Sequence, residues 1–102
     1  MKLQRRVVVT GMGIVSPIGN SINDAWDACK SGISGISFNE TNIPDSPVTI
    51  GGRIKDLDYK EYLDVKEIRR LDPFIQYSLI SSSQAIKDAS IDSSINYSRV
   101  GV

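Results

Sequence analysis

The sequence contains no histidine, and it has a single cysteine, Cys29, in 102 residues. One cysteine cannot form an internal disulfide, so we expect a reducing, cytoplasmic environment. Without histidine the chain has no Cys-His catalytic pair and no typical zinc site, and it lacks the commonest general base at neutral pH. These absences predict a chain that binds no metal and holds no complete nucleophilic centre.

The chain also lacks an excess of charge of either sign. Its 12 basic and 12 acidic residues give a formal net charge of zero, so no overall field attracts nucleic acid or an anionic membrane. No run approaches the roughly 18 apolar residues of a membrane span. The apolar content of 40% is that of an ordinary soluble domain. Any acidic partner must therefore be recognised by a local patch.

Three segments are predicted to be strands. The β-branched run at residues 7–9 favours a strand over residues 5–10 that is buried on both faces. Within an otherwise loop-like stretch, residues 48–54 suggest a short strand with a bulge or bend at Gly51 and Gly52. Residues 99–102 begin another. Because strands need a sheet around them, we expect the opening of a larger α/β domain.

A first helix is predicted after the glycine-containing loop at residues 11–20. Ser21 and Asp24 have the spacing of a capping box, and Gly32 suits the position after the helix end. The expected buried face repeats at helical spacing and consists of Ile22, Trp26, Cys29 and Ile33.

A second helix is predicted from Pro73 to about Ala89, with Asp72 as its N-cap. Two apolar stripes run along it: Ile75, Leu79, Ser82, Ile86 and Ala89 form one, and Phe74, Tyr77, Ser78, Ser81 and Ala85 form the other. We expect burial over much of its circumference, with small residues allowing another element to approach closely. The aromatic residues Trp26, Phe74 and Tyr77 are expected in the core, and Tyr59 and Tyr62 are expected to pin the charged segment 56–72.

The stretch VVVTGMGIVSPIGN at residues 7–20 raises the question of a phosphate-binding loop. The dinucleotide fingerprint is G-x-G-x-x-G, but here Gly19 follows Gly11 and Gly13 three positions too late and Pro17 intervenes. We interpret the glycines as permitting a tight exit from the strand and close backbone packing. A nucleotide-binding protein remains the alternative.

Longer motifs carry a family resemblance. RRVVVTGMGIVSPIGN, followed by AW at residues 25–26 and SGISGI at residues 31–36, resembles the N-terminus of β-ketoacyl-acyl carrier protein synthases. It looks most like the type II elongating enzyme of bacterial fatty acid synthesis, and RRLDPFIQYSL at 69–79 and RVGV at 99–102 continue the match. The resemblance implies a thiolase-like αβαβα layered α/β fold, truncated, with residues 1–102 as the N-terminal portion of its first half. It also implies a cytoplasmic homodimer.

The resemblance implies an acyltransferase that condenses an acyl thioester with malonyl-acyl carrier protein, without a cofactor. In that family a cysteine carries the acyl group, and two histidines assist decarboxylation and stabilise the developing charge. This chain has no histidine, so we expect the catalytic residues beyond Val102 and an inactive chain alone. Cys29 is not expected to be the nucleophile, because its DACKSG context does not match and a helix C-terminus disfavours a thiolate. We expect it to be buried and slow to react with thiol reagents.

One functional patch is predicted within the chain. Lys66, Arg69 and Arg70 stand at i, i+3 and i+4, so a helix would project all three from one face. From the residues alone, a solvated helix with local ion pairs such as Glu67–Arg70 or Glu67–Arg69 is the favoured explanation of this face, because such pairs are common and weak. The resemblance implies that the three cations dock the acidic helix of acyl- or malonyl-loaded acyl carrier protein. A polyketide-type ketosynthase fragment and a non-catalytic acyl carrier protein docking module remain alternatives.

Overall fold

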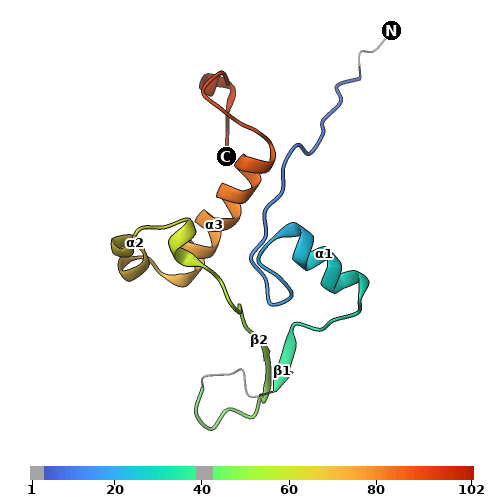
Figure 1. Ribbon diagram of the computed structural model, residues 1–102, viewed down its shortest axis with the longest axis vertical. Helices are drawn as coiled ribbons and strands as arrows, with labels where there is room; N and C mark the ends of the chain where they lie inside the picture. The colour runs from blue at the N-terminus through green and yellow to red at the C-terminus, as the bar shows by residue number, and fades with distance from the viewer. Residues whose placement is uncertain (1–3, 39–42) are drawn as a thin grey trace.

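The computed structural model describes residues 4–38 and 43–102 and has a mixed α/β arrangement. In chain order the elements are α1 (Ile22–Lys30), β1 (Ile36–Phe38), β2 (Ile50–Gly52), the 3₁₀ turn η1 (Tyr59–Glu61), α2 (Val65–Arg70), α3 (Pro73–Asp88) and the 3₁₀ turn η2 (Tyr97–Arg99). Figure 1 shows α3 along the middle, α1 and α2 on opposite sides of it, and the two strands projecting at one end. No helix of the described residues is long and apolar enough to cross a membrane.

The described chain is open rather than compact. Its radius of gyration is 17.8 Å, against about 13 Å for a compact domain of this length. The buried apolar side chains among the described residues are Ala25, Ala28, Leu63 and Ile80. These side chains come from α1, the segment before α2, and α3.

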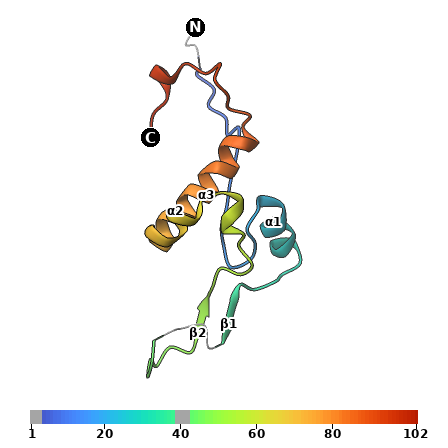
Figure 2. The same ribbon diagram turned by 60° about the vertical axis from the view of Figure 1, so that its left-hand side comes forward.

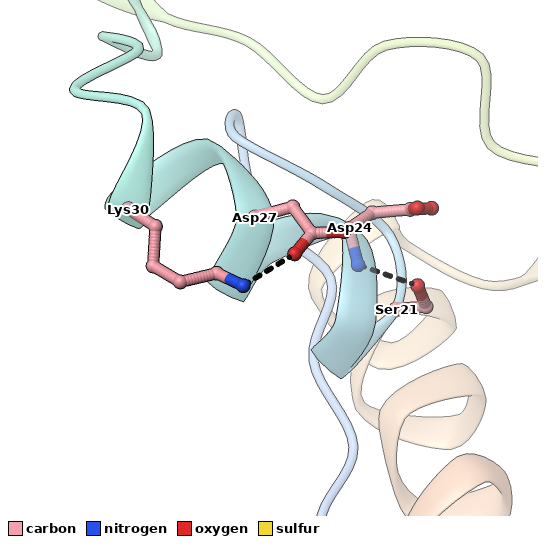
Figure 3. Close-up of polar contacts among 4 residues, drawn as sticks. All are labelled: Ser21, Asp24, Asp27 and Lys30. Carbon is pink, nitrogen blue, oxygen red and sulfur yellow. Dashed lines mark hydrogen bonds and ion pairs between the residues drawn. The ribbon is translucent and has the colours of Figure 1, made fainter.

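Helix α1 begins and ends where the sequence predicts, but only one of the two bonds of the predicted capping box forms. The Ser21 hydroxyl accepts the backbone N–H of Asp24 at 3.2 Å and so caps the first turn. In the last turn the Lys30 ammonium pairs with Asp27 at 3.0 Å, and Figure 3 shows both contacts. Gly32 follows the helix with a φ of +67°, the left-handed conformation that favours glycine at this position.

The predicted buried face of α1 is largely wrong, because only Ile22 among its four residues is half-buried. The buried residues are Ala25 and Ala28, whereas Trp26 is 62% exposed and Cys29 and Ile33 are also exposed. The reason is close packing, because the backbone at Gly19 lies directly against the first turns of this helix. Only a small side chain such as alanine leaves room for such an approach, so the larger apolar residues face outward.

Helix α3 confirms its predicted start, with Asp72 at the N-cap position and Pro73 at N1. Each predicted stripe is confirmed in part, since the half-buried residues are Ile75 and Ala89 of the first and Tyr77, Ser81 and Ala85 of the second. The exposed residues include Phe74, Leu79 and Ile86, where burial was expected. The fully buried residue is Ile80, one turn after the buried Gln76. The buried residues of α3 are thus Gln76 and Ile80, which belong to neither of the predicted stripes.

The glycine loop packs against α3, as the sequence analysis expected. A side chain at Gly13 would overlap the Ser81 carbonyl oxygen, and one at Gly11 would overlap the Ala85 carbonyl oxygen. The N–H of Ile14 donates to Oε1 of Gln84 at 3.0 Å, which ties the loop to the same helix. Figures 1 and 2 both show this N-terminal segment running between α1 and α3.

The strand predictions are largely wrong. Residues 5–10 are extended without a paired neighbour in the described part of the chain, and Val7 is 95% exposed. Residues 99–102 likewise form no strand, and η2 ends at Arg99. β-branched residues favour an extended backbone, but a strand exists only where a neighbour completes its hydrogen bonds.

The region at residues 48–54 does form a strand, but a shorter one. β2 pairs antiparallel with β1, a strand that the sequence analysis missed within its loop-like stretch. Gly51 and Gly52 oppose Ser37 and Ile36 in regular register, so there is no bulge among these pairs. Ile36, Phe38 and Ile50 occupy one face of this hairpin and remain exposed.

Candidate functional site

Helix α2 carries the three predicted docking residues. The segment is helical from Val65 to Arg70, so Lys66, Arg69 and Arg70 share a helix at the expected spacing, and all three are exposed. In Figure 1 this helix lies at the outer edge of the molecule, away from α1 and the hairpin. The structure therefore brings the predicted cations together on a solvent-facing surface.

The acidic neighbour of these cations is engaged elsewhere. Glu67 forms a capping box with Asp64: the Asp64 N–H donates to Glu67 Oε2 at 3.0 Å, and the Glu67 N–H donates to Asp64 Oδ1 at 2.8 Å. Lys66, Arg69 and Arg70 make no ion pair with any described residue. The alternative of local ion pairs to Glu67 is thus not what this structure shows, and the positive charge of the face is left available.

The other end of α2 is held by α3. The Nε2 atom of Gln76 donates to the carbonyl oxygens of Ile68 at 2.8 Å and of Leu71 at 2.9 Å. These oxygens belong to the last helical turn and the residue that ends it, where carbonyls lack partners within the helix. Hydrogen bonds therefore fix α2 at its start and at its end.

The segment before α2 is anchored by aromatic and apolar side chains, as predicted. Tyr59 and Tyr62 are half-buried, and Leu63 is buried. Burial, together with the neighbouring Tyr77 hydroxyl of α3, raises the pKa of Tyr59 above its usual value. This contact links the charged segment to α3 just ahead of the cationic helix.

Cys29 is exposed, which corrects the expectation of a buried thiol. It lies in the last turn of α1, on the outward face that Ala25 and Ala28 leave to solvent. The chain has no histidine that could act as its general base. Cys29 is therefore accessible to solvent, but it lacks the neighbouring base that a nucleophilic cysteine needs.

The glycine loop does not present a phosphate-binding surface. The Met12 N–H donates to Asp88 Oδ2 at 3.0 Å, and the Ile14 N–H donates to Gln84, so amides that would hold a phosphate are already used. Gly11 and Gly13 face carbonyl oxygens of α3, and the Asp88 carboxylate adds negative charge beside them. An anion is disfavoured there.

An open cavity of about 560 Å³ adjoins this loop. It is lined by Met12, Ser21, Ile22, Asn23, Tyr62, Gln84, Lys87 and Asp88. The Gln84 amide also donates to the Asn20 carbonyl at 2.7 Å, so Gln84 and Asp88 in its wall serve to hold the loop.

Two glutamines were missed by the sequence analysis. Gln76 and Gln84 lie eight residues apart on α3, which places them on one side of the helix, and each bridges to backbone atoms of another segment. The sequence contains one indication of their role, which is the spacing of two glutamines on a helix rich in apolar and small residues. The apolar stripes alone do not reveal it.

Taken together, the elements describe a mixed α/β chain whose glycine loop is held by packing and whose cationic helix α2 is exposed and forms no ion pair within residues 4–38 and 43–102. Comparison with known proteins gives the family. A model of the β-ketoacyl synthase N-terminal domain matches residues 4–102, and the chain belongs to this family.

Curated relatives are named 3-oxoacyl-[acyl-carrier-protein] synthase 2. The protein from Staphylococcus aureus (strain COL) is 39% identical, with 100% of this chain and 25% of the relative covered. Those from Vibrio harveyi and Coxiella burnetii (strain RSA 493 / Nine Mile phase I) are 41% and 39% identical, each with 97% of this chain and 24% of the relative covered. The chain thus spans about a quarter of the length of these relatives.

Proposed function

We propose that this chain is the N-terminal portion of a 3-oxoacyl-[acyl-carrier-protein] synthase of fatty acid biosynthesis and that α2 docks the acyl carrier protein. The observation that carries the proposal is the exposed, unpaired set Lys66, Arg69 and Arg70 on α2 in a member of this family. The names of the relatives supply the partner, because each is a synthase acting on groups borne by an acyl carrier protein.

The complete protein, on this proposal, is a cytoplasmic homodimer with the thiolase-like layered fold. Its catalytic cysteine and two histidines lie beyond Val102, and they perform a decarboxylative Claisen condensation of an acyl thioester with malonyl-acyl carrier protein. The lack of histidine within the chain supports the placement of the catalytic residues outside it. The exposed β-branched run at residues 7–9 supports a larger fold, because such a run is typical of a strand that the rest of a sheet would cover. This chain supplies recognition and part of the scaffold, and alone it is inactive.

Docking through α2 has a simple electrostatic basis. Exposed cations facing an acidic helix accelerate encounter and fix the orientation of the partner more than they add affinity. Because the capping box occupies Glu67, the face presents positive charge without internal neutralisation. The interaction weakens with salt, since the screening length is about 8 Å at physiological ionic strength.

The test is charge reversal in the full-length protein. Arg69→Glu combined with Arg70→Glu should raise the KM for malonyl-acyl carrier protein about tenfold, because two attractions become repulsions. Condensation of a small malonyl thioester that lacks the carrier should be unchanged.

The matched control reverses two exposed lysines away from α2, Lys30→Glu with Lys87→Glu, which changes the net charge equally. This control should leave the KM for carrier-borne substrate near the wild-type value. Equal losses on carrier-borne and small substrates, or equal effects of the two double variants, would contradict docking at α2. Carrier binding without any condensation would instead indicate a non-catalytic docking module.

A further inference from the structure

Gln76 is the buried polar side chain of the described residues, with 7% of its surface exposed. Its amide nitrogen donates both of its hydrogens in the direction of α2, to the carbonyl oxygens of Ile68 and Leu71 at 2.8 and 2.9 Å. A buried amide is retained at such a site only when its hydrogen bonds are made, since an unpaired one is costly. The contacts therefore fully use the donor capacity of this side chain.

The two carbonyls that Gln76 binds bracket the docking arginines in the sequence. Arg69 and Arg70 lie between Ile68 and Leu71, so the backbone on both sides of the arginine pair is tied to the same amide. No other side chain of the described residues is hydrogen-bonded to this turn.

Helix α2 needs such support. It has six residues, none of them buried, and helices this short are unstable alone in water. The capping box of Asp64 and Glu67 holds its first turn, and Gln76 holds its last turn. The last turn is the one that carries two of the three cations.

We propose that Gln76 is a positioning residue for carrier docking: through Ile68 and Leu71 it orders the turn that presents Arg69 and Arg70. The inference rests on the proposed function and deepens it. Without the amide, the arginines keep their charge but the turn frays, and the partner must order it on binding. That ordering cost lowers affinity for the carrier and leaves the condensation step itself unaffected.

Helix α3 offers a matched control in Gln84. It is the same residue type on the same helix, and it also bridges to backbone atoms, but it binds Ile14 and Asn20 of the N-terminal loop and not α2. Gln76→Met and Gln84→Met each replace an amide by an apolar side chain of similar length. Each variant loses two hydrogen bonds to the backbone of another segment, so a general loss of stability would affect both.

The experiment compares these two variants in the full-length protein with malonyl-acyl carrier protein and with a small malonyl thioester. Gln76→Met should raise the KM for the carrier substrate about three- to tenfold, with kcat and the small-substrate kinetics unchanged. Hydrogen exchange of the peptide spanning residues 64–72 should accelerate. Gln84→Met should change neither the KM nor exchange in that peptide.

An unchanged KM in Gln76→Met, with faster exchange in α2, would overturn the positioning role. So would an equal rise in KM for Gln84→Met. If Gln76→Met does not fold, Gln76→Asn tests the same role, because its amide is one methylene too short to reach both carbonyls. An unchanged KM for the carrier substrate in Gln76→Asn, with faster hydrogen exchange in α2, would also overturn the positioning role. The Arg69→Glu/Arg70→Glu variant separates the positioning role of Gln76 from docking at α2. If this variant raises the KM for the carrier substrate and the Gln76 variants do not, only the positioning role is wrong. If it leaves that KM unchanged, docking at α2 is wrong as well.

Discussion

Replacing Gly13 by alanine should destabilise the protein by packing alone. The new Cβ would overlap the Ser81 carbonyl oxygen and lie 2.9 Å from Gln84 Cβ. Ordinary contact begins near 3.4 Å, and the overlap with the Ser81 oxygen is closer than the Gln84 contact, so the loop must move away from α3 by well over half an ångström. That movement also stretches the 3.0 Å hydrogen bond from the Ile14 N–H to Gln84.

The expected cost follows from these contacts. Overpacking of this kind costs about 1–3 kcal/mol, and a weakened hydrogen bond to Gln84 adds about 1 kcal/mol. The lower entropy of alanine in the unfolded chain offsets roughly 0.5 kcal/mol. We expect Gly13→Ala to lower the free energy of unfolding by about 1.5–3.5 kcal/mol.

Gly32→Ala provides the comparison. Gly32 has open space around it but a φ of +67°, so alanine there meets conformational strain without a clash. Its expected cost is about 1 kcal/mol. Equilibrium urea unfolding of the full-length variants, followed by circular dichroism, compares both costs, and the midpoint for Gly13→Ala should fall further than that for Gly32→Ala.

A cost for Gly13→Ala no larger than that for Gly32→Ala would refute the packing argument. Thermal stabilisation of the wild type by a dinucleotide, lost in Gly13→Ala, would favour the nucleotide-binding alternative instead. We expect no such stabilisation.

Two further predictions concern the chain as it is described. The isolated 102-residue chain should show a broad thermal transition or aggregate, because its radius of gyration is 17.8 Å and few apolar side chains of the described residues are buried. A sharp cooperative transition in scanning calorimetry would instead indicate an independently folding module. Cys29 should react with a thiol reagent at the rate of an exposed cysteine, and Cys29→Ser should retain condensing activity in the full-length protein; loss of turnover with intact folding would make Cys29 part of the chemistry.

Local signals in the sequence predicted the helices well. Ser21 with Gly32 bounds α1, and Asp72 with Pro73 starts α3, because caps act through bonds within a few residues. The helical spacing of Lys66, Arg69 and Arg70 is likewise local, and α2 confirms it.

Features that depend on distant contacts were not predictable in the same way. The burial of Ala25 instead of Trp26 follows from the close approach of the loop at Gly19, which no periodicity reveals. The strand at residues 5–10 depends on a hydrogen-bonded neighbour that the described residues do not supply. The role of Gln76 depends on where α2 ends relative to α3.

We propose that this chain is the carrier-binding first portion of a condensing enzyme, and the intact mass of the natural protein in its source cell tests this proposal most directly. The chain has a mass of 11.2 kDa and spans 24–25% of its relatives, so the account predicts a product of about four times that mass. A product of 11.2 kDa would contradict it, because such a protein has no histidine and could not perform the condensation.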